Sequence, residues 1–129
     1  MTNPVWVRED VVRAIHRRQI AEHGGAEGVR DQGLPASTLA RPRNRLAYSK
    51  KRPDLAALAA AYAFGIAKNH PFVDGNRRVP LIVCRLFLRL NGRDLEATPQ
   101  EKYPTFLGLA EGRISEKKLT IWIRKHLAR

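Results

Sequence analysis

The feature that most restricts the fold of this chain is an apolar segment, Leu55–Asn69, which offers no polar face to solvent. Ala, Leu and aromatic side chains fill it, and Asp54 directly before it is a good helix N-cap, so we expect a helix here. A helix that is apolar on nearly every side is stable only when other elements surround it. Because the segment is also too short to cross a bilayer, we expect it at the centre of a packed domain.

Five further helices are predicted around this segment from apolar residues that recur at helical spacing and from capping residues at the ends. No credible pair of strands is seen. We therefore predict a single domain over residues 1–129, an all-α bundle of six helices with an active-site loop between the two central ones. The five helices are Val7–His23, a helix begun by Pro35 that contains Pro42, Val79–Leu90, a helix after Thr98 that Gly112 ends, and a helix from Ser115 through Leu127.

The composition limits the environment and the partners. The lone Cys84 argues against a disulfide framework, and no signal or anchor segment is visible, so we expect a cytoplasmic protein with no membrane partner. The formal net charge of +12 predicts attraction to an acidic molecule. Nucleic acid is judged an unlikely partner, because the cations are scattered along the chain and no segment interleaves them with aromatic residues.

Chemistry-bearing residues are concentrated between the two apolar helices, in the segment His70–Arg78, which reads HPFVDGNRR. An imidazole can accept a proton near neutral pH, a carboxylate can bind Mg²⁺, and guanidinium groups match phosphate oxygens. The loop leads into a helix N-terminus, where backbone N–H groups favour anions. A zinc site is not expected, because neither paired cysteines nor an HExxH helix is present. The segment therefore predicts a site that handles a nucleotide phosphate.

The motif His-Pro-Phe-x-Asp-Gly-Asn-x-Arg after an apolar helix resembles the Fic fold, and in particular its Doc branch of toxin kinases. The resemblance extends over nearly the whole chain, from the Gly24-Gly25 turn and the Gly28–Asp31 loop, through Phe87–Gly92, to the last helix with Trp122. A nine-residue motif between two helices is a specific signal.

The resemblance implies roles for individual residues. His70 would be the general base that takes a proton from a Ser or Thr hydroxyl, and Asp74 would bind the Mg²⁺ of ATP, although that carboxylate also suits a helix cap. Gly75, Asn76 and Arg77 would contribute to nucleotide binding. Arg78 would clamp phosphate oxygens and stabilise charge in the transition state, unless it pairs instead with an acid such as Asp31 or Asp54. The other three histidines, at positions 16, 23 and 126, receive no role.

Two departures from the Fic pattern favour one reaction. AMP-transferring members read Gly-Asn-Gly-Arg and carry a second Arg three residues later, whereas this chain has Arg77 and Leu81 at those positions. Doc-type members carry Lys at the first position and similarly lack the second Arg. We therefore predict a kinase that moves the γ-phosphoryl group of ATP. AMP transfer, and an inactive basic binding module, are the alternatives.

The Doc resemblance also implies a target and a partner. The target would be elongation factor Tu, whose modification stops translation. The self-inhibiting signature of many Fic proteins is absent, since Leu107 stands where its hydroxyl residue would precede Glu111-Gly112. An antitoxin protein would then inhibit in trans. The basic connector from Tyr48 to Arg52 lies where related proteins present a flap for the target segment.

Overall fold

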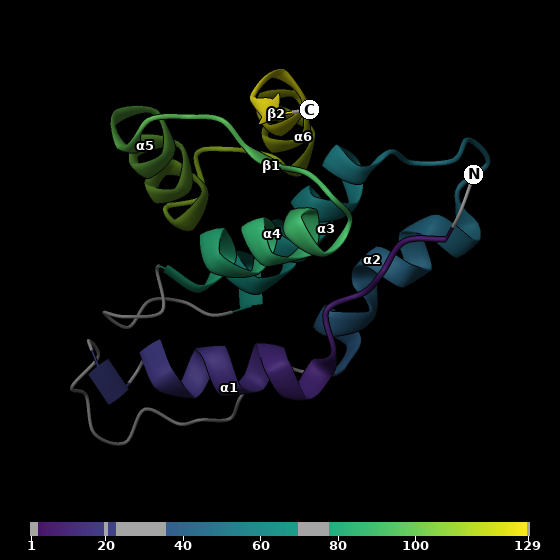
Figure 1. Cartoon of the computed structure of the whole chain (residues 1–129), viewed down its shortest axis with the longest axis horizontal. Helices are drawn as coiled ribbons and strands as arrows, with labels where there is room; N and C mark the ends of the chain where they lie inside the picture. The colour runs from purple at the N-terminus through teal and green to yellow at the C-terminus, as the bar shows by residue number, and fades with distance from the viewer. Residues whose placement is uncertain (1–2, 20, 23–35, 70–77, 129) are drawn as a thin grey trace.

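The computed structural model describes residues 3–19, 21–22, 36–69 and 78–128 of the 129-residue chain. These residues form six α-helices and one pair of very short strands (Figure 1), which confirms the predicted all-α bundle. Along this part of the chain, no helix is both long and apolar enough to cross a membrane. The elements are α1 (Glu9–Gln19), α2 (Ala36–Tyr48), α3 (Leu55–Asn69), α4 (Val79–Leu90), β1 (Asp94–Leu95), α5 (Pro99–Ala110), α6 (Glu116–Lys125) and β2 (Leu127–Ala128).

The apolar helix α3 lies at the centre, as the sequence predicts, and packs against α2, α4 and α6. Every side chain from Ala56 to Ala63 is buried, and six of those eight residues are alanine. Small side chains let three neighbouring helices approach one axis closely. Asp54 caps the helix as expected, because its carboxylate accepts a hydrogen bond from the amide of Ala57 at 2.9 Å.

The helix α4 provides the other half of the core. Val83, Cys84, Phe87 and Leu88 have no exposed surface, and the Phe87 ring packs against Tyr62 of α3 with centroids 5.2 Å apart. Pro80 is accommodated in the first turn, where backbone donors have no helical acceptor. The chain then turns away at Gly92, whose φ of +80° few other residues adopt.

Capping residues determine where α5 and α6 begin. Thr98 and Glu101 form the predicted capping box, and Ser115 accepts the amide hydrogen of Lys118. Gly112 separates the two helices with a φ of +79°. These signals act over three or four residues, which is why the sequence reveals them.

The N-terminal segment before α1 is tied to the core by side chains. The Val7 amide donates to the Tyr62 hydroxyl at 3.1 Å. Asn91 accepts from the Val5 amide at 2.7 Å and donates to the Val5 carbonyl at 2.9 Å. The Trp6 ring stacks on Phe87 with centroids 5.9 Å apart. This segment holds the start of α1 beside α4.

Several boundaries differ from the sequence-based expectation. The first helix begins at Glu9 rather than Val7, and the last helix ends at Lys125 rather than Leu127. The residues beyond Lys125 form the antiparallel pair Asp94↔Ala128 and Leu95↔Leu127. No strand pair was expected, because two-residue strands are too short to show an alternating pattern.

The helix α2 continues through Pro42, whose ring is buried. Its inward face consists of Thr38, Leu39 and Pro42, with Leu46 half-buried. Ala47 is exposed. The buried positions lie one to four residues apart, so the helix turns Ala47 toward solvent.

Candidate active site

The motif lies between the two central helices in the sequence. The described part of α3 ends at Asn69 and α4 begins at Val79, with Arg78 as its N-cap. His70, Asp74, Gly75, Asn76 and Arg77 lie outside the described residues, so their roles stay predictions. Of the predicted site residues, the structure describes Arg78.

The guanidinium group of Arg78 is available to a ligand. Its backbone is helical at φ −85° and ψ −23°, its side chain makes no capping hydrogen bond, and the residue is exposed. The alternative pairing with Asp54 is wrong, because Asp54 binds Arg124 at 2.7 Å; Asp31 lies outside the described residues. Arg78 therefore stands at the positive end of the α4 dipole, where an anion is favoured.

Arg78 also borders a groove of about 1110 Å³ between α4 and α5. The groove has a largely apolar surface, which includes Leu81 and Ile82 from α4 and Phe106 and Leu107 from α5. Its charged residues are all basic in the described part of the chain. These are Arg78, Arg85, Arg89 and Lys102. A groove of this size with a few convergent cations suits an anionic ligand that also has an apolar part.

One of these cations is fixed in place. Arg85 donates two hydrogen bonds to the carboxylate of Asp94, at 3.1 and 3.0 Å, and Arg89 lies 3.9 Å from the same carboxylate. The hydrogen bond from Arg85 is the main cause that lowers the pKa of Asp94, and the same bond raises the pKa of Arg85. Because the single negative charge of Asp94 is shared by two guanidinium groups, this wall of the groove keeps a net positive charge.

A second cavity, of about 410 Å³, lies beside the C-terminal part of α3. Phe64, Ala67 and Lys68 from the last turns of α3 line it, together with the turn between α5 and α6. Arg113 and Lys118 add positive charge. The two helices that flank the motif in the sequence, α3 and α4, thus each border a basic cavity.

The basic connector lies at the opposite end of α3 from Asn69. Residues 49–53 precede the N-terminus of α3, whereas the motif follows its C-terminus. A helix of 15 residues separates the two ends by about 22 Å at 1.5 Å per residue. Because the motif residues 70–77 lie outside the described residues, the flap role of Tyr48–Arg52 stays a prediction.

Sequence reasoning missed several residues around the groove. Arg85 follows Arg78 by seven positions, or two helical turns, so a helical projection could have placed both on one face. Asp94 and Gln19 carry no such signal, because they come from other elements. Among the described residues, no three His, Cys, Asp or Glu side chains are grouped to hold a metal ion.

The fold agrees with what comparison of the sequence with known proteins shows. The chain belongs to the Fic/DOC family, whose sequence model matches residues 6–88. It is similar to the protein named Protein kinase doc of Escherichia phage P1, with 33% identity over 112 residues, 87% of each chain. It is also similar to the protein named Toxin Doc of Mycolicibacterium smegmatis, with 40% identity over 90 residues, which are 70% of this chain and 66% of that protein.

Membership of this family implies the use of a nucleotide, and the name of the phage relative indicates a kinase or another transferase. The described residues fit the phosphate end of such a ligand. Arg78 has no acidic partner among them, and it stands at a helix N-terminus that opens beside a basic groove.

Proposed function

We propose that this protein is a toxin that transfers the γ-phosphoryl group of ATP to a Ser or Thr hydroxyl of a translation factor, namely elongation factor Tu. The names of the two relatives support both parts of this proposal, toxin and kinase. The observation that carries it is the pair formed by Arg78 and Leu81 on one wall of the groove.

The pair favours phosphoryl transfer over AMP transfer. In AMP-transferring members of the family, a second arginine stands three residues after the first. Here Leu81 takes that position, and it borders the same groove as Arg78. An apolar side chain there cannot bind a second phosphate group, so Arg78 and the loop before it would hold the triphosphate.

The proposed chemistry assigns one task to each motif residue. His70 would take the proton of the acceptor hydroxyl as its oxygen attacks the γ-phosphorus, and ADP would leave. Arg78 would bind the equatorial oxygens, whose charge changes in the transition state. Asp74 would hold Mg²⁺, which neutralises phosphate charge when bound. Gly75, Asn76 and Arg77 would bind the remaining phosphate oxygens.

Inhibition would come from an antitoxin in trans. Glu111 and Gly112 at the end of α5 lack the preceding hydroxyl residue of the self-inhibiting signature. The groove beside Arg78 is large and mostly apolar, so it can accept a segment of another protein. A partner that covers Arg78 there would exclude ATP phosphates.

The reaction is tested with purified protein, elongation factor Tu and ATP that carries either a γ-phosphate label or an adenosine label. The proposal predicts that only the γ label enters elongation factor Tu. Arg78→Ala should abolish incorporation while the circular dichroism spectrum and melting temperature stay unchanged, and Arg17→Ala, on the exposed side of α1, should retain it. Adenosine label in the product, or full incorporation by Arg78→Ala, would refute the assignment.

A further inference from the structure

The smaller cavity, beside the C-terminal part of α3, has a composition that suits a ligand of its own. Its volume of about 410 Å³ lies at the lower end of the range of about 300–1,000 Å³ that small-molecule sites occupy. A small ligand therefore fits it better than a segment of another chain does. None of its lining residues has a task in the proposed phosphoryl transfer.

Apolar side chains from three parts of the chain contribute to the lining. Phe64 and Ala67 come from α3, and Leu109 comes from α5. Ile114 belongs to the turn between α5 and α6, and it packs closely on α5, because a Cβ at Gly108 would lie 3.0 Å from its side chain. Glycine at this position allows the close approach, which fixes Ile114 at the edge of the cavity.

Three cations complete the lining, and no acidic residue lines the cavity in the part of the chain that the structure describes. They are Lys68, Arg113 and Lys118. The Nζ of Lys68 lies 5.9 Å from the centroid of the Phe64 ring, and Arg113 is paired with Glu111 at 2.7 Å. One carboxylate thus offsets one of the three positive charges, so about two charges remain for a ligand.

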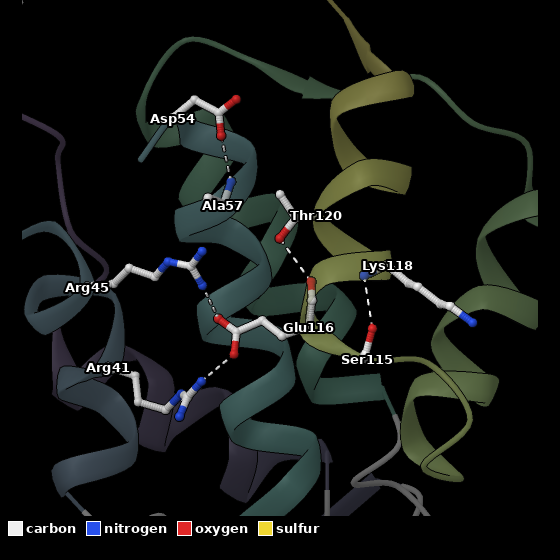
Figure 2. A network of polar contacts seen from close by, with 8 residues as sticks. All are labelled: Arg41, Arg45, Asp54, Ala57, Ser115, Glu116, Lys118 and Thr120. Atoms are coloured by element: carbon white, nitrogen blue, oxygen red, sulfur yellow. Dashed lines mark hydrogen bonds and ion pairs between the residues drawn. The ribbon is translucent and has the colours of Figure 1, made fainter. Parts of the chain in front are cut away.

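The carboxylate at the start of α6 does not neutralise this charge. Glu116 binds Arg41 and Arg45 of α2, and Figure 2 shows Lys118 extending from the other side of α6. The two residues are two positions apart on a helix with 3.6 residues per turn, so they point in nearly opposite directions. The cavity therefore keeps the charge of Lys118.

We propose that this cavity binds a small organic phosphate monoester with an apolar body. A phosphate monoester carries nearly two negative charges near neutral pH, which matches the charge that remains. Its oxygens bind Lys118, Arg113 and the hydroxyl of Ser115, which accepts the Lys118 amide hydrogen at 3.1 Å and can donate its own hydrogen. Its apolar body lies against Phe64 and Ile114.

The test follows binding of phenyl phosphate to the full chain in amide NMR spectra at about 0.15 M salt, without ATP or elongation factor Tu. Saturable shifts should include the amides of Ile114, Ser115 and Lys118, with a Kd of about 1 mM or below. Inorganic phosphate lacks the apolar body and should bind at least about 10-fold more weakly. Because no step of the proposed transferase reaction is involved, either proposal can fail without the other.

Single variants assign the binding to the cavity. Lys118→Ala removes a phosphate partner and should weaken binding about 10-fold; the side chain is exposed, so the fold should be retained. Lys117→Ala is the matched control, because Lys117 is an exposed lysine on the same helix that does not line the cavity. It should bind as the unmodified protein does. Arg78→Ala should do the same, since Arg78 borders the other groove.

Four outcomes would overturn the proposal. Equal losses in Lys117→Ala and Lys118→Ala would show general attraction to a basic protein. Equal binding of inorganic phosphate and phenyl phosphate would show an adventitious ion only. Loss of binding in Arg78→Ala would assign the probe to the groove between α4 and α5. Absence of saturable shifts at the cavity residues would leave the cavity without a phosphate ligand.

Discussion

Arg124 in the last turn of α6 donates two hydrogen bonds to the carboxylate of Asp54, the N-cap of α3, at 2.7 and 3.1 Å. One carboxylate thus caps the start of the central helix and joins it to a residue of α6 that lies 70 positions further along the chain. The Asp54 side chain is half exposed, so the cap should contribute more to stability than the ion pair does.

The relative size of the two contributions can be measured. Asp54→Ala removes both, and it should lower the free energy of unfolding by about 1–2 kcal/mol. Arg124→Ala leaves the cap in place and should cost less than about 1 kcal/mol. Urea unfolding of both single variants and of the double variant gives the coupling free energy between Asp54 and Arg124. If the two single variants lose equal free energy of unfolding, the cap does not contribute more than the ion pair.

The pH dependence of stability should report the same carboxylates. The hydrogen bond from Arg124 lowers the pKa of Asp54 and the hydrogen bond from Arg85 lowers the pKa of Asp94, both from an ordinary value of 3.8. A lowered pKa in the folded state adds stability that is complete above the ordinary value and is lost as the pH falls through the lowered one.

We therefore expect the free energy of unfolding to begin to fall as the pH drops below about 4. The double variant D54N/D94N cannot titrate at these positions, so its stability should change less between pH 5 and pH 2. Parallel curves for the variant and the unmodified protein would show that these two carboxylates contribute little.

The two ion pairs that Glu116 forms with Arg41 and Arg45 should contribute more to stability than an ordinary surface ion pair does. Arg41 and Arg45 both bind this carboxylate, whose side chain is only 17% exposed. Glu116→Ala should cost about 1–3 kcal/mol, since two neighbouring guanidinium groups lose their shared acceptor. Glu111→Ala, which breaks the half-exposed pair with Arg113, serves as the control and should change stability by less than about 0.5 kcal/mol in thermal melts.

Cys84 should report global unfolding. It is the single cysteine of the chain, it has no exposed surface, and burial raises the pKa of its thiol to about 12. Because the thiolate is the reactive form, a thiol reagent at pH 8 should label the native protein only at the rate of unfolding. Labelling that is fast in the absence of denaturant would show that α4 opens locally.

The sequence predicts those parts of the fold that depend on neighbouring residues. Thr98 with Glu101 and Ser115 with Lys118 mark helix starts within four positions, and the apolar composition of α3 is enough to place it at the centre. The antiparallel pair of Leu95 with Leu127 joins distant segments that carry no local signal, so it could not be predicted.

The same distinction holds for the site. The order of residues in the motif indicates a phosphate-handling loop, and Arg78 indeed stands at the start of α4. The sequence could not show that Arg78 does not pair with Asp54, because that depends on Arg124 of α6, which binds the Asp54 carboxylate instead. The exposure of Tyr48 likewise depends on where α2 ends.

The most direct test of the proposed chemistry is the intact mass of elongation factor Tu after incubation with Mg²⁺, ATP and either the unmodified protein or His70→Ala. The unmodified protein should add the mass of one phosphate, and His23→Ala, a control to which no role is assigned, should do the same. His70→Ala should react at least about 100-fold more slowly. Full activity of His70→Ala, or a mass gain of one AMP, would contradict the account.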